Sequence, residues 1–227
     1  MTRIHLYDTT LRDGTQREGL TLSASDKVKI AVRLDAFGID TIEGGWPGSN
    51  PKDAEFFRRV SSAPLHRARI AAFGSTRRVG VSCEDDASVQ ALMEANTPVV
   101  TIVGKSSVTH VQRVLETSRE ENLRLISDTV SYLSALGKTV VYDAEHFFDG
   151  LALDASYALA TLEAARDAGA SVLVLCDTNG GSEPRAIGDA VDRVSRRLRA
   201  QLGIHPHNDR GLALANALAA LAAGCTH

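Results

Sequence analysis

Several features that would narrow the class of this protein are missing from its 227 residues. No apolar run approaches the roughly 18 residues that a membrane-spanning helix needs, and the N-terminus leads into a strand-like segment without a signal peptide. The net charge is −3, so the chain has no basic surface of the kind that binds nucleic acid or anionic lipid. We therefore expect a cytoplasmic protein that acts on small molecules, with no nucleic-acid or membrane partner.

Cysteines and linkers are scarce as well. The three cysteines, Cys83, Cys176 and Cys225, are odd in number and lack the spacing of a metal site. They fit a reducing compartment, in which each is expected to be a small buried side chain. No Pro/Gly/Ser-rich linker or low-complexity segment divides the chain, which predicts one domain over residues 1–227.

What the sequence does contain is a regular alternation of short apolar runs and amphipathic helical stretches. This rhythm is typical of a parallel sheet in which each strand is followed by a helix. Residues 23–26 have the character of a capping box, and Gly38 closes the helix that they open. Strands are predicted over 4–7, 39–43, 68–73, 99–103, 139–142, 172–176 and 203–205, and further helices over 154–169, 184–202 and 212–223.

Seven strand–helix units nearly exhaust the chain, and Thr226 and His227 could open an eighth strand. A (β/α)8 barrel usually takes about 250 residues, so we expect an α/β TIM barrel cut short before strand eight. A doubly wound sheet is the alternative, but it would gather its site at one crevice, whereas here polar residues follow strand after strand. The open seam would leave two unpaired strand edges, which predicts a chain that is weakly stable or inactive unless the missing part is supplied.

Two histidines on one strand and a carboxylate near the start of the chain form a candidate metal site. His205 and His207 are two residues apart, so on a strand both side chains point to the same side. Asp13 follows the first predicted strand and would add a carboxylate. Such a mixed set suits Mg²⁺, Mn²⁺, Zn²⁺ or Co²⁺, and a pair of hydrogen-bonded structural histidines is the alternative.

Other polar side chains at the strand ends suggest chemistry on an oxyacid or a carbonyl. Arg12 offers a fork of donors that could bind a 2-oxo acid, or it could form an ion pair with Asp13 or Glu43. Glu145, among Phe and His, could have the raised pKa of a general acid or base, although Asp143 lies on the same strand face and competes for that role.

The roles of three further residues stay open. Thr178, in a Gly-rich turn, could hold a substrate carboxylate or simply belong to the turn. His110 and Lys105 follow the fourth strand and could contact substrate or lie on the rim. No lysine lies within a predicted strand in a position for Schiff-base chemistry, which favours a metal-dependent route.

Two segments resemble the signatures of a known family. Residues 8–16, Asp-Thr-Thr-Leu-Arg-Asp-Gly-Thr-Gln, resemble the opening motif of the acyl-CoA-condensing DRE-TIM metallolyases, and residues 205–209, His-Pro-His-Asn-Asp, resemble their metal-binding strand. The family includes the 2-isopropylmalate, homocitrate and citramalate synthases, with 3-hydroxy-3-methylglutaryl-CoA (HMG-CoA) lyase as a relative. Segments 43–53, 142–150 and 176–181 are most similar to its citramalate synthase branch, and the resemblance covers essentially the whole chain.

The resemblance implies a Claisen-type condensation of acetyl-CoA with pyruvate that gives (R)-citramalate and CoA, on a pyruvate route to isoleucine. It implies that Asp13, His205 and His207 ligate a divalent metal, Mg²⁺ or Mn²⁺ or else Zn²⁺ or Co²⁺, which polarises the ketone. Arg12 would stabilise the developing alkoxide. A homodimer is usual for the family.

The same resemblance implies that Glu145 takes part in proton transfer, that Thr178 holds the pyruvate carboxylate and that His110 is a pocket histidine. The family's strand-eight segment, whose Asn adds a metal ligand, and its C-terminal accessory region are absent from these residues. Three alternatives stay open: a synthase that uses another 2-oxo acid, a carbon–carbon lyase of the HMG-CoA lyase type, and a non-catalytic barrel remnant.

Overall fold

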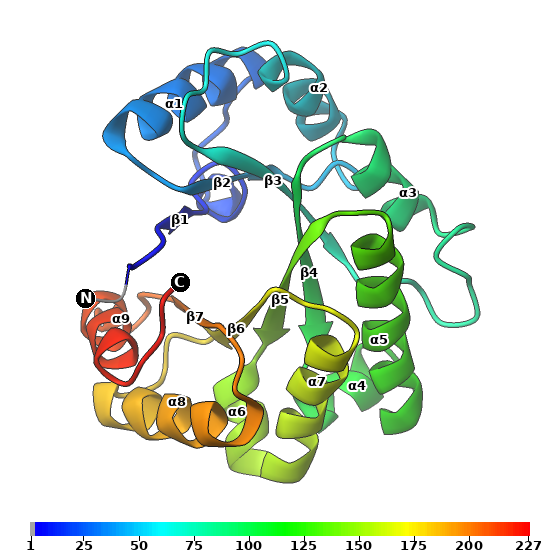
Figure 1. Ribbon diagram of the computed structural model, residues 1–227, viewed down its shortest axis with the longest axis vertical. Helices are drawn as coiled ribbons and strands as arrows, with labels where there is room; N and C mark the ends of the chain where they lie inside the picture. The colour runs from blue at the N-terminus through cyan, green and yellow to red at the C-terminus, as the bar shows by residue number, and fades with distance from the viewer. Residues whose placement is uncertain (1–2) are drawn as a thin grey trace.

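The computed structural model describes residues 3–227. Its framework is a parallel sheet in which seven strands follow one another in chain order. Figure 1 shows that the sheet curls until β1 and β7 lie on the same side of the molecule, near both chain ends. A doubly wound sheet would reverse its strand order, so the expected TIM-type barrel is confirmed. The strands are β1 (Tyr7–Asp8), β2 (Thr41–Gly45), β3 (Arg69–Ser75), β4 (Val99–Lys105), β5 (Thr139–Glu145), β6 (Val172–Asp177) and β7 (Leu202–Pro206).

Helices cover the outer face of this sheet (Figure 1). They are α1 (Ala24–Phe37), α2 (Pro51–Val60), α3 (Ala87–Glu94), α4 (Val108–Arg113), α5 (Arg119–Ala135), α6 (Phe147–Leu153), α7 (Ala155–Asp167), α8 (Pro184–Leu198) and α9 (Ala213–Ala222), with a 3-10 turn, η1, over Asp13–Gln16. The predicted capping box is present, because the Ser23 hydroxyl accepts from Asp26 N and the Asp26 carboxylate accepts from Ser23 N. None of the helices among the described residues has the length and apolarity needed to cross a membrane.

Several predicted element boundaries are wrong, among them the following two. The helix expected over 184–202 ends at Leu198, because Arg199 adopts a left-handed conformation with φ of 47° and Leu202 already begins β7. The first strand, expected over 4–7, is confined to Tyr7 and Asp8. Its short length follows from its position at the edge of the sheet, where only β2 supplies a strand partner.

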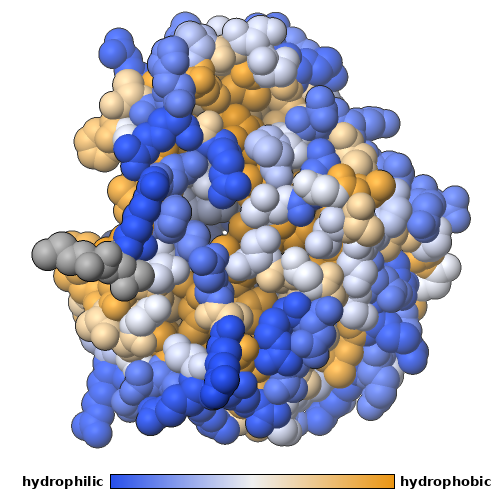
Figure 2. Space-filling view, viewed as in Figure 1, coloured by the Kyte–Doolittle hydropathy of each residue, from blue (hydrophilic) through white to orange (hydrophobic). Residues whose placement is uncertain are grey.

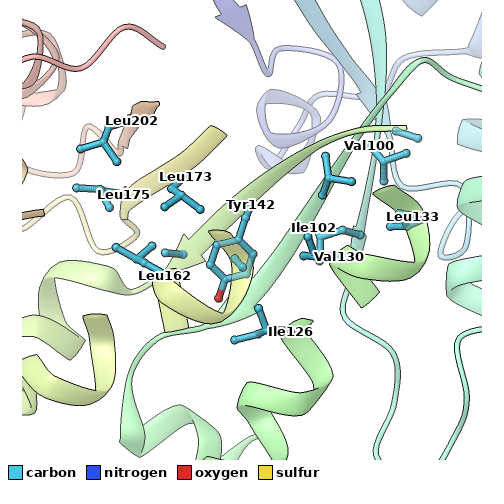
Figure 3. Close-up of a cluster of buried hydrophobic side chains, with 14 of the residues drawn as sticks. Val100, Ile102, Ile126, Val130, Leu133, Tyr142, Leu162, Leu173, Leu175 and Leu202 are labelled. Carbon is cyan, nitrogen blue, oxygen red and sulfur yellow. The ribbon is translucent and has the colours of Figure 1, made fainter. Parts of the chain in front are cut away.

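The main core lies between the sheet and its helices rather than inside the curl of the sheet. Figure 3 shows Tyr142 of β5 at the centre of this layer, with Ile102 on one side and Leu173 on the other. All three side chains are fully buried. The three cysteines are buried and unpaired, as expected from the sequence. This layer fixes the positions of β4, β5 and β6 and therefore of the polar residues at their carboxyl ends.

The sheet has an open seam between β7 and β1. Thr226 and His227 lie in this seam, where Thr226 N donates to Leu202 O of β7 and Thr226 O accepts from His5 N, next to β1. The backbone of these last residues therefore runs along both edges, at the place of an eighth strand. Apolar surface is exposed over α1 and α9 on either side of the seam, as Figure 2 shows, and includes Phe37 and Leu214, which are 81% and 74% exposed.

Candidate active site

The carboxyl ends of the strands surround a cavity of about 300 Å³. Its lining comes from both halves of the barrel, which is where TIM-type barrels place their active sites. Six of the seven predicted site residues line it: Arg12, Asp13, Glu145, Thr178, His205 and His207. The seventh, His110, is not among the lining residues. It packs edge-on against His146, with ring centroids 4.1 Å apart, and His146 does not line the cavity either.

The three predicted metal ligands converge on one point. Asp13 Oδ2 lies 3.2 Å from His205 Nε2 and 3.5 Å from His207 Nε2, and the two imidazole rings are stacked with centroids 5.0 Å apart. Asp13 enters η1 directly after the β1 segment, whereas both histidines belong to the end of β7 or follow it. The set therefore spans the seam.

The pKa values of Asp13 and His205 are shifted by their burial and by the charged groups that they contact. The hydrogen bond to His205 and the neighbouring Arg12 guanidinium lower the pKa of Asp13 to about 2, although burial opposes the shift. Burial alone would lower the pKa of His205, but Asp13 and Asp143 raise it well above its ordinary value.

Carboxylates outnumber cations in and directly beside this cavity. The acidic side chains are Asp13, Glu43, Asp143 and Glu145, and the permanently cationic partners are Arg12 and Lys105. An excess of carboxylates in a largely buried site is costly unless a cation balances it. A divalent ion on the Asp13–His205–His207 set would supply that balance, and the nitrogen and oxygen donors suit it.

Arg12 forms an ion pair with Glu43, which was one of the alternatives that the sequence left open. Arg12 Nε donates to Glu43 Oε1 at 2.6 Å, and its guanidinium carbon lies 3.9 Å from the centroid of the Phe73 ring. Glu43 is fully buried on β2 and also accepts from the Tyr7 hydroxyl at 2.6 Å. Burial raises the pKa of Glu43, while Arg12 opposes the shift. Tyr7 was missed in the sequence because it lies in an unremarkable apolar run.

Glu145 is paired with Lys105 across two adjacent strands. The two residues are register partners at the ends of β4 and β5, and Lys105 Nζ donates to Glu145 Oε2. Asp143, which the sequence left as an equal candidate for acid–base chemistry, instead faces His205, with Asp143 Oδ2 3.8 Å from Nδ1. The structure therefore separates two carboxylates that share a strand face.

The hydroxyl of Thr178 accepts a hydrogen bond within the protein but donates none to residues 3–227. Its oxygen accepts from the backbone N–H of His146 at 2.8 Å, which leaves the hydroxyl hydrogen free for an acceptor in the cavity. His146 itself has φ of 53°, a left-handed conformation that is strained for a side chain with Cβ. The strain lies directly after Glu145 and turns the chain from β5 into α6.

The neighbouring loops are fixed by their own hydrogen bonds. The Asp177 carboxylate accepts from the backbone N–H of Gly181 and Ser182 and so closes the turn that carries Thr178. The side chain of Asn208 accepts from Ala213 N at the start of α9. No hydrogen bond joins either histidine ring to Asn208 or Asp209 in residues 3–227.

The loop after β2 is held by a buried ion pair that the sequence did not indicate. Lys27 of α1 donates to Asp53 of α2, and Asp53 Oδ2 accepts from Trp46 N at 2.8 Å. Gly45 has φ of 152°, and a Cβ there would lie 2.4 Å from Asp53 Cγ, so only glycine fits. The loop therefore places Trp46 in the wall of the cavity.

A His–His–carboxylate set beside an arginine, at the carboxyl ends of a parallel barrel, defines a TIM-type barrel protein with a candidate divalent-metal centre. The chain belongs to the HMGL-like family, which it matches over residues 3–227. The resemblance to the DRE-TIM metallolyases is thereby confirmed.

Sequence relatives divide into two groups. The chain is 53% identical to the (R)-citramalate synthase of Synechocystis sp. over 99% of its own length and 43% of that protein. It is 50% identical to the (R)-citramalate synthase of Streptomyces coelicolor, over 98% of its own length and 42% of that protein. The 2-isopropylmalate synthase of Methanocaldococcus jannaschii is 32% identical over 98% of this chain and 40% of that protein. The chain thus spans less than half of the length of the curated relatives that it matches.

Solved structures share the fold. The HMG-CoA lyase of Bacillus subtilis superposes with a TM-score of 0.82 at 20% identity, over 100% of this chain and 76% of the lyase. An HMG-CoA lyase of Acinetobacter baumannii in complex with coenzyme A and 3-methylmalate gives 0.77 at 22% identity, over 99% of this chain and 73% of that one. At these identities the likeness establishes the barrel architecture.

Proposed function

We propose that this protein condenses acetyl-CoA with pyruvate to give (R)-citramalate and CoA. The observation that carries the proposal is the difference in identity between two groups of relatives. Five (R)-citramalate synthases are 46–53% identical over nearly the whole chain, whereas the 2-isopropylmalate synthases are 32–36% identical. The residues that line the cavity support the same chemistry.

Asp13, His205 and His207 would hold a divalent ion, which when bound supplies a Lewis acid that polarises the ketone of the 2-oxo acid. Mg²⁺ and Mn²⁺ are the leading candidates, and Zn²⁺ and Co²⁺ also suit two imidazoles and a carboxylate. The excess of carboxylates over cations around the cavity supports a divalent rather than a monovalent ion.

Arg12 and Thr178 would bind the oxygens of the 2-oxo acid. Glu43 fixes one edge of the Arg12 guanidinium, so its remaining N–H groups are oriented before substrate arrives. They would stabilise the negative charge that develops on the keto oxygen as the new carbon–carbon bond forms. The free hydroxyl hydrogen of Thr178 would donate to the pyruvate carboxylate.

Glu145 would remove a proton from the methyl group of acetyl-CoA. The acetyl carbon then bonds to the keto carbon of pyruvate, and the keto oxygen takes up a proton to become the tertiary hydroxyl. Water cleaves the thioester and releases CoA, which balances the reaction. Lys105, paired with Glu145, would hold this carboxylate in position for the proton transfer. By resemblance to the family, His110 is proposed as a substrate-binding pocket histidine, although it lies outside the cavity lining and packs against His146.

Two related activities use the same residue types. A synthase that acts on a larger 2-oxo acid would differ in the cavity wall, and a lyase would cleave a carbon–carbon bond next to a metal-bound alcohol. The higher identity to the citramalate synthases favours pyruvate. A homodimer in the cytoplasm is the assembly and location that we propose by analogy with the family.

The decisive experiment is CoA release from acetyl-CoA, followed with a thiol reagent. Pyruvate, 2-oxoisovalerate and 2-oxoglutarate are offered in turn, each with Mg²⁺, with Mn²⁺ and with a chelator. We expect metal-dependent release with pyruvate alone. Release only with another acid would change the substrate and keep the mechanism, whereas no release from folded, metal-loaded protein would contradict a synthase.

A further inference from the structure

Asp143 is a buried carboxylate that the mechanism above does not use. Its side chain is only 9% exposed, although it lies on β5 inside the barrel and lines the cavity. It faces His205, whose Nδ1 lies 3.8 Å from Asp143 Oδ2. That separation is longer than a direct hydrogen bond of about 3.2 Å at most. A nine-tenths buried charge without a close donor is costly, so its presence requires a reason.

The two ring nitrogens of His205 face different carboxylates. Nε2 lies 3.2 Å from Asp13 Oδ2, at the point where the candidate metal ligands meet, whereas Nδ1 lies on the Asp143 side. An imidazole can bind a metal through one nitrogen only if that nitrogen is deprotonated, so the proton must be on the other. A carboxylate beside the second nitrogen favours that tautomer and fixes the ring orientation.

We propose that Asp143 is a positioning residue, which holds the proton of His205 on Nδ1 and thereby directs the Nε2 lone pair to the metal. This inference rests on the proposed function, because it concerns the same metal set. Asp143 thus acts on the reaction through His205 and not by touching substrate.

Neighbouring residues argue against other roles for Asp143. Glu145, two residues along the same strand, has Lys105 as its partner and faces the substrate side of the cavity, so the acid–base role is already filled. Cys176 is a competing neighbour of His205, since Asp143, Cys176 and His205 present ligand atoms within 4.8 Å of one another. A thiol is a weak acceptor compared with a carboxylate, so Asp143 is the better partner for an N–H donor.

The test compares metal affinity in four proteins: the parent, Asp143→Ala, Asp143→Asn and the matched neighbour control Cys176→Ser. Mn²⁺ affinity is measured by competition with a chelator, and circular dichroism establishes that each variant is folded. We expect Asp143→Ala to bind Mn²⁺ about 10- to 100-fold more weakly than the parent. Asp143→Asn, whose amide oxygen still accepts, should lose less, and Cys176→Ser should bind like the parent.

A second readout reports the tautomer directly. In ¹⁵N-histidine NMR spectra of the Zn²⁺-loaded chain, we expect His205 to carry its proton on Nδ1 in the parent, with altered or exchange-broadened signals in Asp143→Ala. Unchanged affinity and an unchanged tautomer in a folded Asp143→Ala protein would overturn the inference, as would an equal loss of affinity in Cys176→Ser. If the parent binds Mn²⁺ in an Asp143-dependent way but releases no CoA, the proposed function fails and the positioning role stands.

Discussion

The two sides of the cavity mouth are supported in different ways. On one side, Lys105 and Glu145 end β4 and β5, which pair along their full lengths and lie over the main core. On the other side, Asp13 follows a strand of two residues, and His205 and His207 lie at the edge strand β7. The acid–base side thus takes its geometry from the sheet, whereas the metal side depends on contacts between side chains across the seam.

The largest effect is expected on the metal side, from Asp13→Asn. Both histidines approach the same Asp13 oxygen, so this change removes the point that the three ligands share. We expect kcat/KM for CoA release to fall by at least about 10³-fold, because the Lewis acid supplies several kcal/mol of stabilisation. Stoichiometric Mn²⁺ binding should be lost in the same protein. Full Mn²⁺ binding by Asp13→Asn would show that the metal lies elsewhere.

On the acid–base side, Glu145→Gln should lower kcat by about 10²- to 10⁴-fold, the usual contribution of a positioned proton acceptor. Since Glu145 pairs with Lys105 and has no ion pair with Asp13, His205 or His207 among the described residues, the affinity for Mn²⁺ should stay within about twofold of the parent. Steady-state kinetics and chelator competition on one preparation measure both. If Glu145→Gln lost both metal and activity, Glu145 would also be needed for metal binding. The two sides of the cavity would then not be independent.

Gly104→Ala tests how rigidly the sheet supports the acid–base side. A Cβ at Gly104 would lie 2.6 Å from the hydroxyl oxygen of Tyr142, which is fully buried. Overpacking of this kind should lower the free energy of unfolding by about 1–3 kcal/mol, measured by urea denaturation. Gly181→Ala is the control, because a Cβ there has no neighbour within 4 Å. Equal stability of the two variants would show that β4 and β5 can shift to accommodate the added methyl group at little cost.

The smallest effect is a pH dependence of the seam itself. Burial and the stacked ring of His5 lower the pKa of His227 to about 4, against 6.5 for an ordinary histidine. Between these values the unfolded chain binds more protons than the folded chain, so stability falls as the pH drops from about 6.5 to 4. With allowance for solvent screening, the loss between pH 7 and pH 5 should be about 1 kcal/mol.

Parallel urea titrations of the parent and His227→Gln isolate that contribution. The parent should lose more stability than the variant between pH 7 and pH 5, because glutamine does not titrate. The same loss in both proteins would mean that His227 stays exposed to water and that the seam does not enclose it.

Sequence patterns predicted the parts of the molecule that depend on local periodicity. The seven strands, the TIM-type order and the convergence of Asp13 with His205 and His207 follow from residue spacing and from the rule that parallel strands end on one side. The helix end at Leu198 was missed because Arg199 adopts a left-handed conformation without the glycine that usually signals it.

Contacts between distant strands were less predictable. Asp143 and Glu145 have different partners, His205 of β7 and Lys105 of β4, whereas strand parity alone makes the two carboxylates equivalent. The buried Lys27–Asp53 pair joins two helices, so no periodicity in either helix could indicate it. Distances of this kind require the register of the whole sheet.

The position of the metal set across the seam has a structural consequence. An ion bound to Asp13, His205 and His207 would cross-link the first strand of the sheet to the last and close a loop of roughly 190 residues, with the loss of chain entropy that such a closure brings to the unfolded state. In this chain the metal would therefore act as a structural cross-link as well as a Lewis acid. Its binding energy would be shared between activating a substrate and keeping the two ends of an open barrel together.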